Sequence, residues 1–185
     1  MSLDLFTYLM FACFFLLFFI ARFFTIMIHE LGHALTAIKF TKQYAIVYIG
    51  SYEDASGCIQ INKGLLEINI KKNPLTWVKG LCIASEDDMT LKQRLIQVLA
   101  GPLSSFVIAI VAAVIVFAFD MHGSIKLMMA IFLLSAMIDL LINLRPSTFR
   151  TYNYGMVDSD GRQALELIRD WYREREILKG RGRRR

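Results

Sequence analysis

The chain has 185 residues, a formal net charge of +5 and a hydrophobic fraction of 56%. Soluble proteins average about 45 to 50%, and the mean hydropathy of this chain is +0.47. The length argues against a multidomain enzyme, and the hydrophobic excess indicates a membrane protein. The three cysteines, Cys13, Cys58 and Cys82, are far apart. We therefore expect free thiols rather than a disulfide framework or a Cys-x-x-Cys metal site.

Three apolar segments predict three transmembrane helices, because about 20 residues cross a bilayer. The first apolar run continues past Arg22, where no turn residue interrupts it, so one long helix is favoured over a hairpin. It lacks a basic leader and a small-residue cleavage site, so we interpret it as a retained helix rather than a secretory signal. The expected spans are about residues 5–38, 95–119 and 125–144.

The distribution of Lys and Arg predicts the orientation of these helices. Residues 1–4 contain none and residues 120–126 contain one, against eight in residues 39–94 and eleven in residues 145–185. Basic loops stay on the cytoplasmic side. We therefore expect a multi-pass protein of the cell membrane, with its N-terminus outside and its C-terminus in the cytoplasm.

Between the first two helices the hydrophobic period changes to two. Ile59 and Ile61 alternate with polar residues, as do Leu66, Ile68 and Ile70, and Asn62-Lys63-Gly64 is typical of a hairpin turn. With a further strand over residues 44–50, the pattern predicts a small amphipathic β-meander over about residues 44–84, at the cytoplasmic membrane surface. A structural connector is an equally good interpretation of this segment.

The C-terminal segment has helical periodicity from residue 161 onward. Leu165, Ile168 and Trp171 or Tyr172 recur opposite arginines, which predicts an interfacial amphipathic helix over about residues 161–178. Residues 179–185 are too charged to pack and are expected to form a basic, disordered tail. Attraction to anionic lipid explains this charge, so no nucleic-acid partner is expected.

The chemistry is concentrated in His29-Glu30-Leu31-Gly32-His33. Positions i and i+4 share one face of a helix, so both imidazoles can bind one Zn²⁺ and Glu30 can reach a water on it. Two helix-packing histidines are the alternative, but polar groups are costly in a membrane helix unless they have a function. A catalytic zinc also needs a third protein ligand, which this motif does not supply.

The chain resembles the site-2 protease family of membrane-embedded zinc proteases, whose first motif reads His-Glu-x-Gly-His. The resemblance covers residues 23–167, with its matching stretches at residues 29–34, Ala100-Gly101-Pro102-Leu103, Asn143-Leu144-Arg145-Pro146 and Asp160-Gly161. It implies one Zn²⁺ per chain held by His29, His33 and Asp160, with Glu30 as general base and Asn143 binding the substrate backbone or the oxyanion. Two departures are the 13 residues between Pro146 and Asp160, where the family has few, and Ser105, where it commonly has Asn.

Alternatives to Asp160 as third ligand stay open. Asp160 precedes a predicted helix and has Gln163 three residues on, which is also the pattern of a capping box. Asp158 and Asp139 are the reserve ligands. Asp139 shares a helical face with Asn143, so it either supports the metal site from behind or pairs with Arg22.

The resulting expectation is an α-helical membrane protein that acts as an intramembrane zinc endopeptidase on a membrane-bound or membrane-associated protein. The orientation places both halves of the site on the cytoplasmic side, and an outer strand of the 44–84 segment could pair with an extended substrate. The alternatives are a non-catalytic membrane adaptor that retains the fold, and a zinc protease acting on peptides at the cytoplasmic surface. The expected partners are the lipid bilayer and a protein or peptide substrate, and the sequence leaves a homo-oligomer open.

Overall fold

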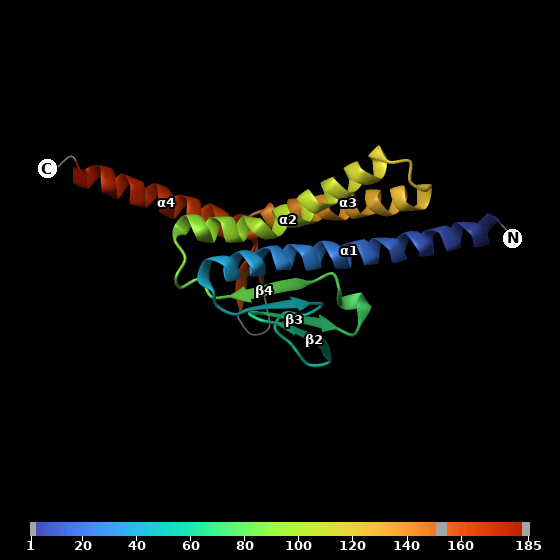
Figure 1. Cartoon of the computed structure of the whole chain (residues 1–185), viewed down its shortest axis with the longest axis horizontal. Coiled ribbons are helices and arrows are strands. Elements are labelled where there is room, and N and C mark those ends of the chain that lie inside the picture. Colours follow the sequence, from blue (N-terminus) through green and yellow to red (C-terminus); the bar gives the residue numbers. More distant parts are fainter. Residues whose placement is uncertain (1–2, 151–154, 183–185) are drawn as a thin grey trace.

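The structure is a computed structural model that describes residues 3–150 and 155–182. It is mostly helical, with three long apolar helices and a small mixed sheet (Figure 1). In chain order the elements are α1 (Leu3–Thr41), β1 (Ala45–Ile49), β2 (Cys58–Lys63), β3 (Leu66–Lys71), the 3-10 turn η1 (Pro74–Thr76), β4 (Gly80–Ala84), α2 (Leu91–Ala118), α3 (Gly123–Leu144), β5 (Thr148–Arg150), β6 (Met156–Asp158) and α4 (Asp160–Gly182).

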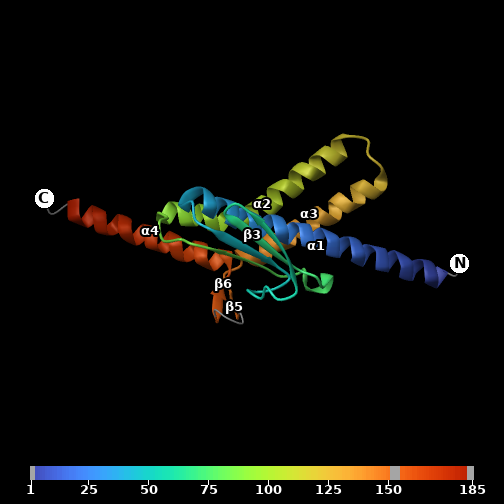
Figure 2. The ribbon, with the colours of Figure 1, turned by 60° about the horizontal axis from the view of Figure 1, so that its bottom comes forward.

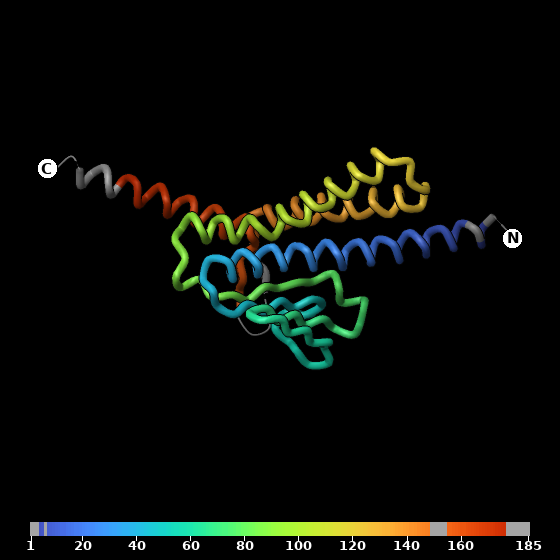
Figure 3. Tube along the Cα trace, viewed as in Figure 1, coloured from blue at the N-terminus to red at the C-terminus, as the bar shows by residue number. Residues whose placement is uncertain are grey.

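Helices α1, α2 and α3 are each long and apolar enough to cross a membrane, by length and composition. α1 runs without a break through Arg22, as the sequence predicts. The three helices lie side by side around a core of small and aromatic side chains (Figures 1 and 3). That core comprises Ala21, Ala109, Ile131, Phe132 and Ala136.

Helices α1 and α2 approach each other closely at Gly32. A Cβ atom there would lie 2.5 Å from the carbonyl oxygen of Ala100, so only glycine allows this spacing. Close to this point, the Ser104 hydroxyl lies 3.0 Å from the carbonyl oxygen of Ile28 on α1. Small residues permit such backbone contacts between membrane helices. The contact fixes the face of α1 that carries the two histidines relative to α2.

The sheet has the strand order β2-β3-β1-β4 and is mixed rather than a meander. β1 pairs with β3 in parallel and with β4 antiparallel, whereas a meander would pair consecutive strands. The predicted hairpin is confirmed between β2 and β3, with Gly64 at a φ of +62°. β1 takes the centre because its side chains are almost all buried, while exposed β2 takes an edge.

The sheet packs on the second half of α1. Ile26 and Ala34 of the helix meet Ala45, Val47 and Ile49 of β1, all of which are buried. The Phe23 and Trp77 rings add a contact with 4.5 Å between their centroids. This packing places β4 alongside the helix segment that carries the His-Glu-x-x-His motif (Figure 1).

The C-terminal helix predicted from the sequence is present as α4. In two views it extends from the end of the bundle along the long axis of the molecule (Figures 1 and 2). Ala164 and Leu167 of α4 pack on Val98 at the start of α2, and the interfacial position of this helix stays a prediction. The helix also continues through Gly182, which corrects the expected start of a disordered tail at residue 179. Residues 183–185 of that tail lie outside the described residues.

The three cysteines are free thiols, as predicted.

Candidate metal centre

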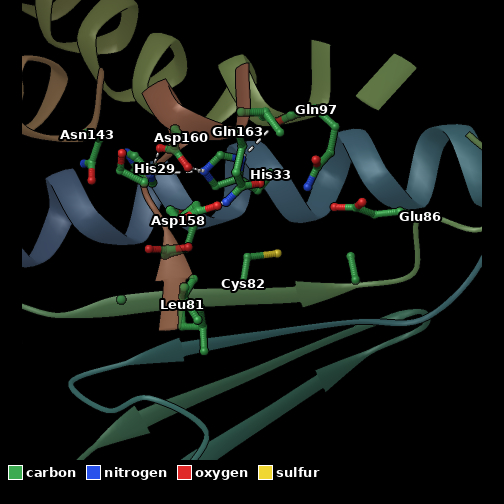
Figure 4. Close-up of a pocket in the computed structure, with 16 residues that line it drawn as sticks. His29, His33, Leu81, Cys82, Glu86, Gln97, Asn143, Asp158, Asp160 and Gln163 are labelled. Carbon is green, nitrogen blue, oxygen red and sulfur yellow. Dashed lines mark hydrogen bonds and ion pairs between the residues drawn. The ribbon is translucent and has the colours of Figure 1, made fainter. Parts of the chain in front are cut away.

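The two histidines of α1 lie on one face of the helix and point into the same cavity (Figure 4). Both are buried, at 5% and 6% exposure for His29 and His33. Their Nε2 atoms are 3.1 Å apart. The i, i+4 spacing therefore brings the two imidazoles together, as the sequence predicts.

The other nitrogen of each ring is occupied by an acceptor from a different helix. His29 Nδ1 lies 2.8 Å from Oδ2 of Asp139 on α3, and His33 Nδ1 lies 2.8 Å from the backbone carbonyl of Gln97 on α2. Both acceptors require the proton on Nδ1. Each neutral ring then presents the lone pair of its Nε2 to the cavity.

Asp160 adds a third electron-pair donor at the same point. Its carboxylate oxygens lie 3.2 Å from His29 Nε2 and 3.5 Å from His33 Nε2. Its Oδ2 is buried and has no hydrogen-bond partner in the part of the chain that the structure describes. One ligand atom from each of His29, His33 and Asp160 lies within 4.8 Å of the others. Three converging lone pairs repel one another unless a proton or a metal cation lies between them, and two imidazoles with one carboxylate fit a metal ion.

Ser159, directly before Asp160, holds the backbone at this point in place. Its hydroxyl donates to the carbonyl of Arg145 at 2.7 Å and accepts from the backbone N–H of Ser147 at 3.0 Å. Ser159 also accepts from the backbone N–H of Arg162, so this residue caps α4 and the Asp160 carboxylate stays free. The capping alternative for Asp160 is therefore wrong.

The long segment between Pro146 and Asp160 forms the β5–β6 hairpin, whose two ends meet at Ser159. Gly161 then packs on the end of α3, where a Cβ atom would lie 2.0 Å from the carbonyl oxygen of Leu144. Asp160 therefore lies beside His29 and His33 despite the greater length of this segment. Residues 151–154, inside this segment, are outside the described residues.

Neither reserve ligand belongs to the metal-binding group among the described residues. Asp158 lines the cavity, but its carboxylate lies 3.4 Å from Nε of Arg162. Asp139 contacts the outer nitrogen of His29 and also lies 3.0 Å from Nη1 of Arg22. Asp139 thus does both things considered from the sequence: it supports His29 from behind, and it pairs with Arg22.

Glu30 and Asn143 line the same cavity, which has a volume of about 200 Å³. Glu30 is 8% exposed and lies against β4, where a Cβ atom on Gly80 would be 2.5 Å from its Oε1. The absence of a side chain at Gly80 therefore makes room for this carboxylate. The structure brings together all five residues singled out from the sequence: His29, Glu30, His33, Asn143 and Asp160.

Sequence reasoning missed residues that shape the cavity without being ligands. Gly101 was singled out only by resemblance, yet a Cβ atom there would lie 2.1 Å from His33 Nε2. A glycine inside an apolar helix was the available signal for such a close approach. Gln97 and Cys82 also line the cavity, and nothing in their local sequence indicated it. Burial, and next the Glu30 carboxylate, raise the pKa of the Cys82 thiol well above its usual value, which keeps it protonated.

Two comparisons with known proteins add no relative. No protein-family model matches the chain, and no curated protein matches it. The metal centre therefore rests on the chain's own residues: two buried imidazoles and a carboxylate that converge on one point and could hold a metal ion.

Proposed function

We propose that this chain is an intramembrane zinc endopeptidase of the site-2 protease type, which hydrolyses peptide bonds in a membrane-bound or membrane-associated protein. The observation that carries the proposal is the convergence of His29 Nε2, His33 Nε2 and the Asp160 carboxylate. Two imidazoles and one carboxylate form a ligand set known from catalytic zinc sites, which keep one further position open. The neighbouring Glu30 and the adjoining cavity are what hydrolysis needs in addition.

The proposed setting is the cytoplasmic side of the cell membrane. Basic residues flank the cytoplasmic ends of α1, α2 and α3 in our orientation, and the outer turn and N-terminus carry almost none. His29 and His33 lie in the second half of α1, and Asp160 follows the end of α3. The site then lies toward the cytoplasmic boundary, within reach of a substrate segment leaving the bilayer.

In the proposed mechanism, His29, His33 and Asp160 would hold Zn²⁺, which when bound would act as a Lewis acid and would bring the pKa of water at the site to about 7. Glu30 is adjacent in sequence to His29 and its carboxylate faces the cavity beside β4. From there it can take a proton from the attacking water and return it to the leaving amine. Asn143, at the end of α3, offers an amide that can hydrogen-bond the substrate carbonyl.

The free edge of β4 supports binding of an extended substrate. The N–H of Gly50 donates to the carbonyl of Lys79 at 2.8 Å, which sets the alternation of hydrogen bonds between β1 and β4. Gly80, Cys82 and Ala84 therefore turn their N–H and C=O groups away from β1. These three residues line the cavity. A substrate that adds to β4 as a further strand would present its main chain to Glu30.

Zinc content of the detergent-purified protein tests the metal centre. We expect about one Zn²⁺ per chain in the wild type and in Asp158→Ala, and loss of the metal in His33→Ala and Asp160→Ala. Asp158→Ala is the matched control because its carboxylate lines the cavity but pairs with Arg162. A folded wild type without zinc would overturn the proposal and favour the adaptor hypothesis.

Proteolysis tests the chemistry and the strand. Glu30→Gln should keep the zinc and lose cleavage of a co-expressed membrane substrate. Cys82→Pro removes an outward N–H from β4, and Gln60→Pro removes the corresponding outward N–H from the opposite edge strand, β2. We expect Cys82→Pro alone to reduce cleavage at unchanged zinc content. Equal cleavage by both proline variants would exclude the β4 edge as the binding strand.

A further inference from the structure

Gln97 has an unused hydrogen-bonding group in the cavity of the metal centre. The residue is 8% exposed and lines the cavity together with both histidines. Its side-chain Oε1 is buried and has no hydrogen-bond partner within residues 3–150 and 155–182. Its backbone carbonyl, by contrast, is already occupied by His33 Nδ1. The backbone carbonyl of Gln97 thus contacts His33, while its side-chain Oε1 has no hydrogen-bond partner among the described residues.

A second glutamine that lines the same cavity does have a hydrogen-bond partner for its side chain, so the cavity does not prevent such pairing. Gln163 also lines the cavity, and its side-chain nitrogen donates to the backbone carbonyl of Asp158 at 2.8 Å. Buried polar groups are nearly always paired, because an unpaired one destabilises the fold relative to an apolar group of the same shape. The unpaired oxygen of Gln97 therefore points to a donor that arrives with a ligand.

The position of Gln97 indicates which donor this is. In Figure 4, β4 borders the cavity on one side and Gln97 descends from α2 on the other, beside His33. An extended peptide directs its main-chain groups alternately to its two edges. If one edge pairs with β4, the N–H groups of the other edge face away from the sheet, where Gln97 offers an acceptor.

We propose that Oε1 of Gln97 binds a main-chain N–H of the substrate, on the peptide edge opposite β4. The proposal rests on the proposed peptidase function and extends it, because it assigns the second edge of the bound peptide. The substrate would then lie between a strand and one glutamine side chain, held through its main chain on both edges. Recognition of this kind is largely independent of the side chains of the substrate.

Matched hydroxamate probes test the proposal on the zinc-loaded protein in detergent. Acetohydroxamate carries only the metal-binding group. A trileucine hydroxamate adds a peptide main chain to the same group. A further set of probes is the trileucine hydroxamate with each amide N-methylated in turn. Affinities are measured by calorimetric titration for the wild type, Gln97→Met and Gln163→Met. Zinc content and thermal unfolding are recorded for each protein.

We expect Gln97→Met to weaken the trileucine probe about tenfold, as loss of one hydrogen bond to a buried group would, and to leave acetohydroxamate binding unchanged. N-methylation of one amide should weaken binding to the wild type by a similar factor and have no effect in Gln97→Met. The same variant should unfold at an equal or higher temperature than the wild type, since it removes an unpaired buried oxygen. Gln163→Met should unfold at a lower temperature and retain the N-methylation effect.

Three results would overturn the proposal. If Gln97→Met keeps the affinity for the trileucine probe, or keeps the N-methylation effect, the side chain does not bind the peptide main chain. If Gln97→Met loses zinc, its side chain is needed to position the histidines rather than to bind the substrate. These results differ from failure of the peptidase function. If that function fails, the wild type binds neither zinc nor the probes; if only the Gln97 proposal fails, the wild type binds zinc and both probes.

Discussion

The two sides of the metal centre hold their histidines by different means. On the α2 side, His33 is bound by a backbone carbonyl and fits only because residue 101 has no side chain. On the α3 side, His29 is bound by the carboxylate of Asp139, which is itself paired with Arg22. A backbone contact survives any side-chain change, so the α2 side is sensitive to space. The α3 side is sensitive to charge and hydrogen bonding, and substitutions of Asp139 can weaken its contact with His29 to different degrees.

The largest effect is expected from filling the space on the α2 side. In Gly101→Ala the new Cβ would overlap His33 Nε2, so we expect the variant to lose its zinc entirely. Gly123→Ala, at the start of α3, is the control, because a Cβ there meets nothing within 4 Å. Zinc analysis of both purified proteins checks this. A full complement of zinc in Gly101→Ala would show that the α2 side is not limited by space.

A smaller, graded effect is expected on the α3 side. Asp139→Ala removes the acceptor of His29 Nδ1, and loss of such a supporting carboxylate weakens metal binding by roughly 10 to 100-fold. Asp139→Asn keeps an oxygen that can accept the same hydrogen bond, so it should lose less. Competition with a zinc chelator measures both affinities. Equal losses in the two variants would mean that charge, rather than the orientation of the ring, is what Asp139 supplies.

The smallest effects are expected from hydrogen bonds that join the helices outside the metal centre. Ser104→Ala removes the hydroxyl that contacts Ile28 between α1 and α2, and Thr25→Val removes the hydroxyl 2.9 Å from Ser135 between α1 and α3. Hydrogen bonds between membrane helices contribute about 0.6 kcal/mol on average. We expect a loss of this size in the free energy of unfolding for each variant, at unchanged zinc content. Loss of zinc in one of them would reveal that this helix contact also sets the histidine geometry.

The sequence predicted those parts of the fold that depend on local pattern. The lengths of the apolar segments predicted α1, α2 and α3, and Gly64 indicated the β2–β3 hairpin. Both signals depend on neighbouring residues alone. The pairing of β1 between β3 and β4 was missed, since it depends on burial under α1 rather than on the order of strands. The contact of α4 with the start of α2 was not predicted for the same reason: its apolar stripe is equally suited to lipid and to α2.

In the candidate site, too, the residues set by a local sequence pattern were predicted directly, and those set by contacts between elements were predicted only as candidates or not at all. His29, Glu30 and His33 are set by the periodicity of a single helix and were found from it. Asp139 and Asp160 are brought in by other elements, so the sequence could give only candidates, and Asp158 was one of them. Gln97 contacts His33 through its backbone carbonyl, from a second helix. No local pattern records such a contact.

Ser159 bridges Arg145 and Ser147 and thereby fastens together the two ends of the segment that carries the β5–β6 hairpin. Because the two ends of this segment are joined at Ser159, a change in its length should move Asp160 very little. We therefore expect insertions and deletions between Thr148 and Met156 to be tolerated without loss of zinc. The hairpin is a suitable place for an affinity tag or a fluorescent label, attached beside the metal centre yet mechanically independent of it.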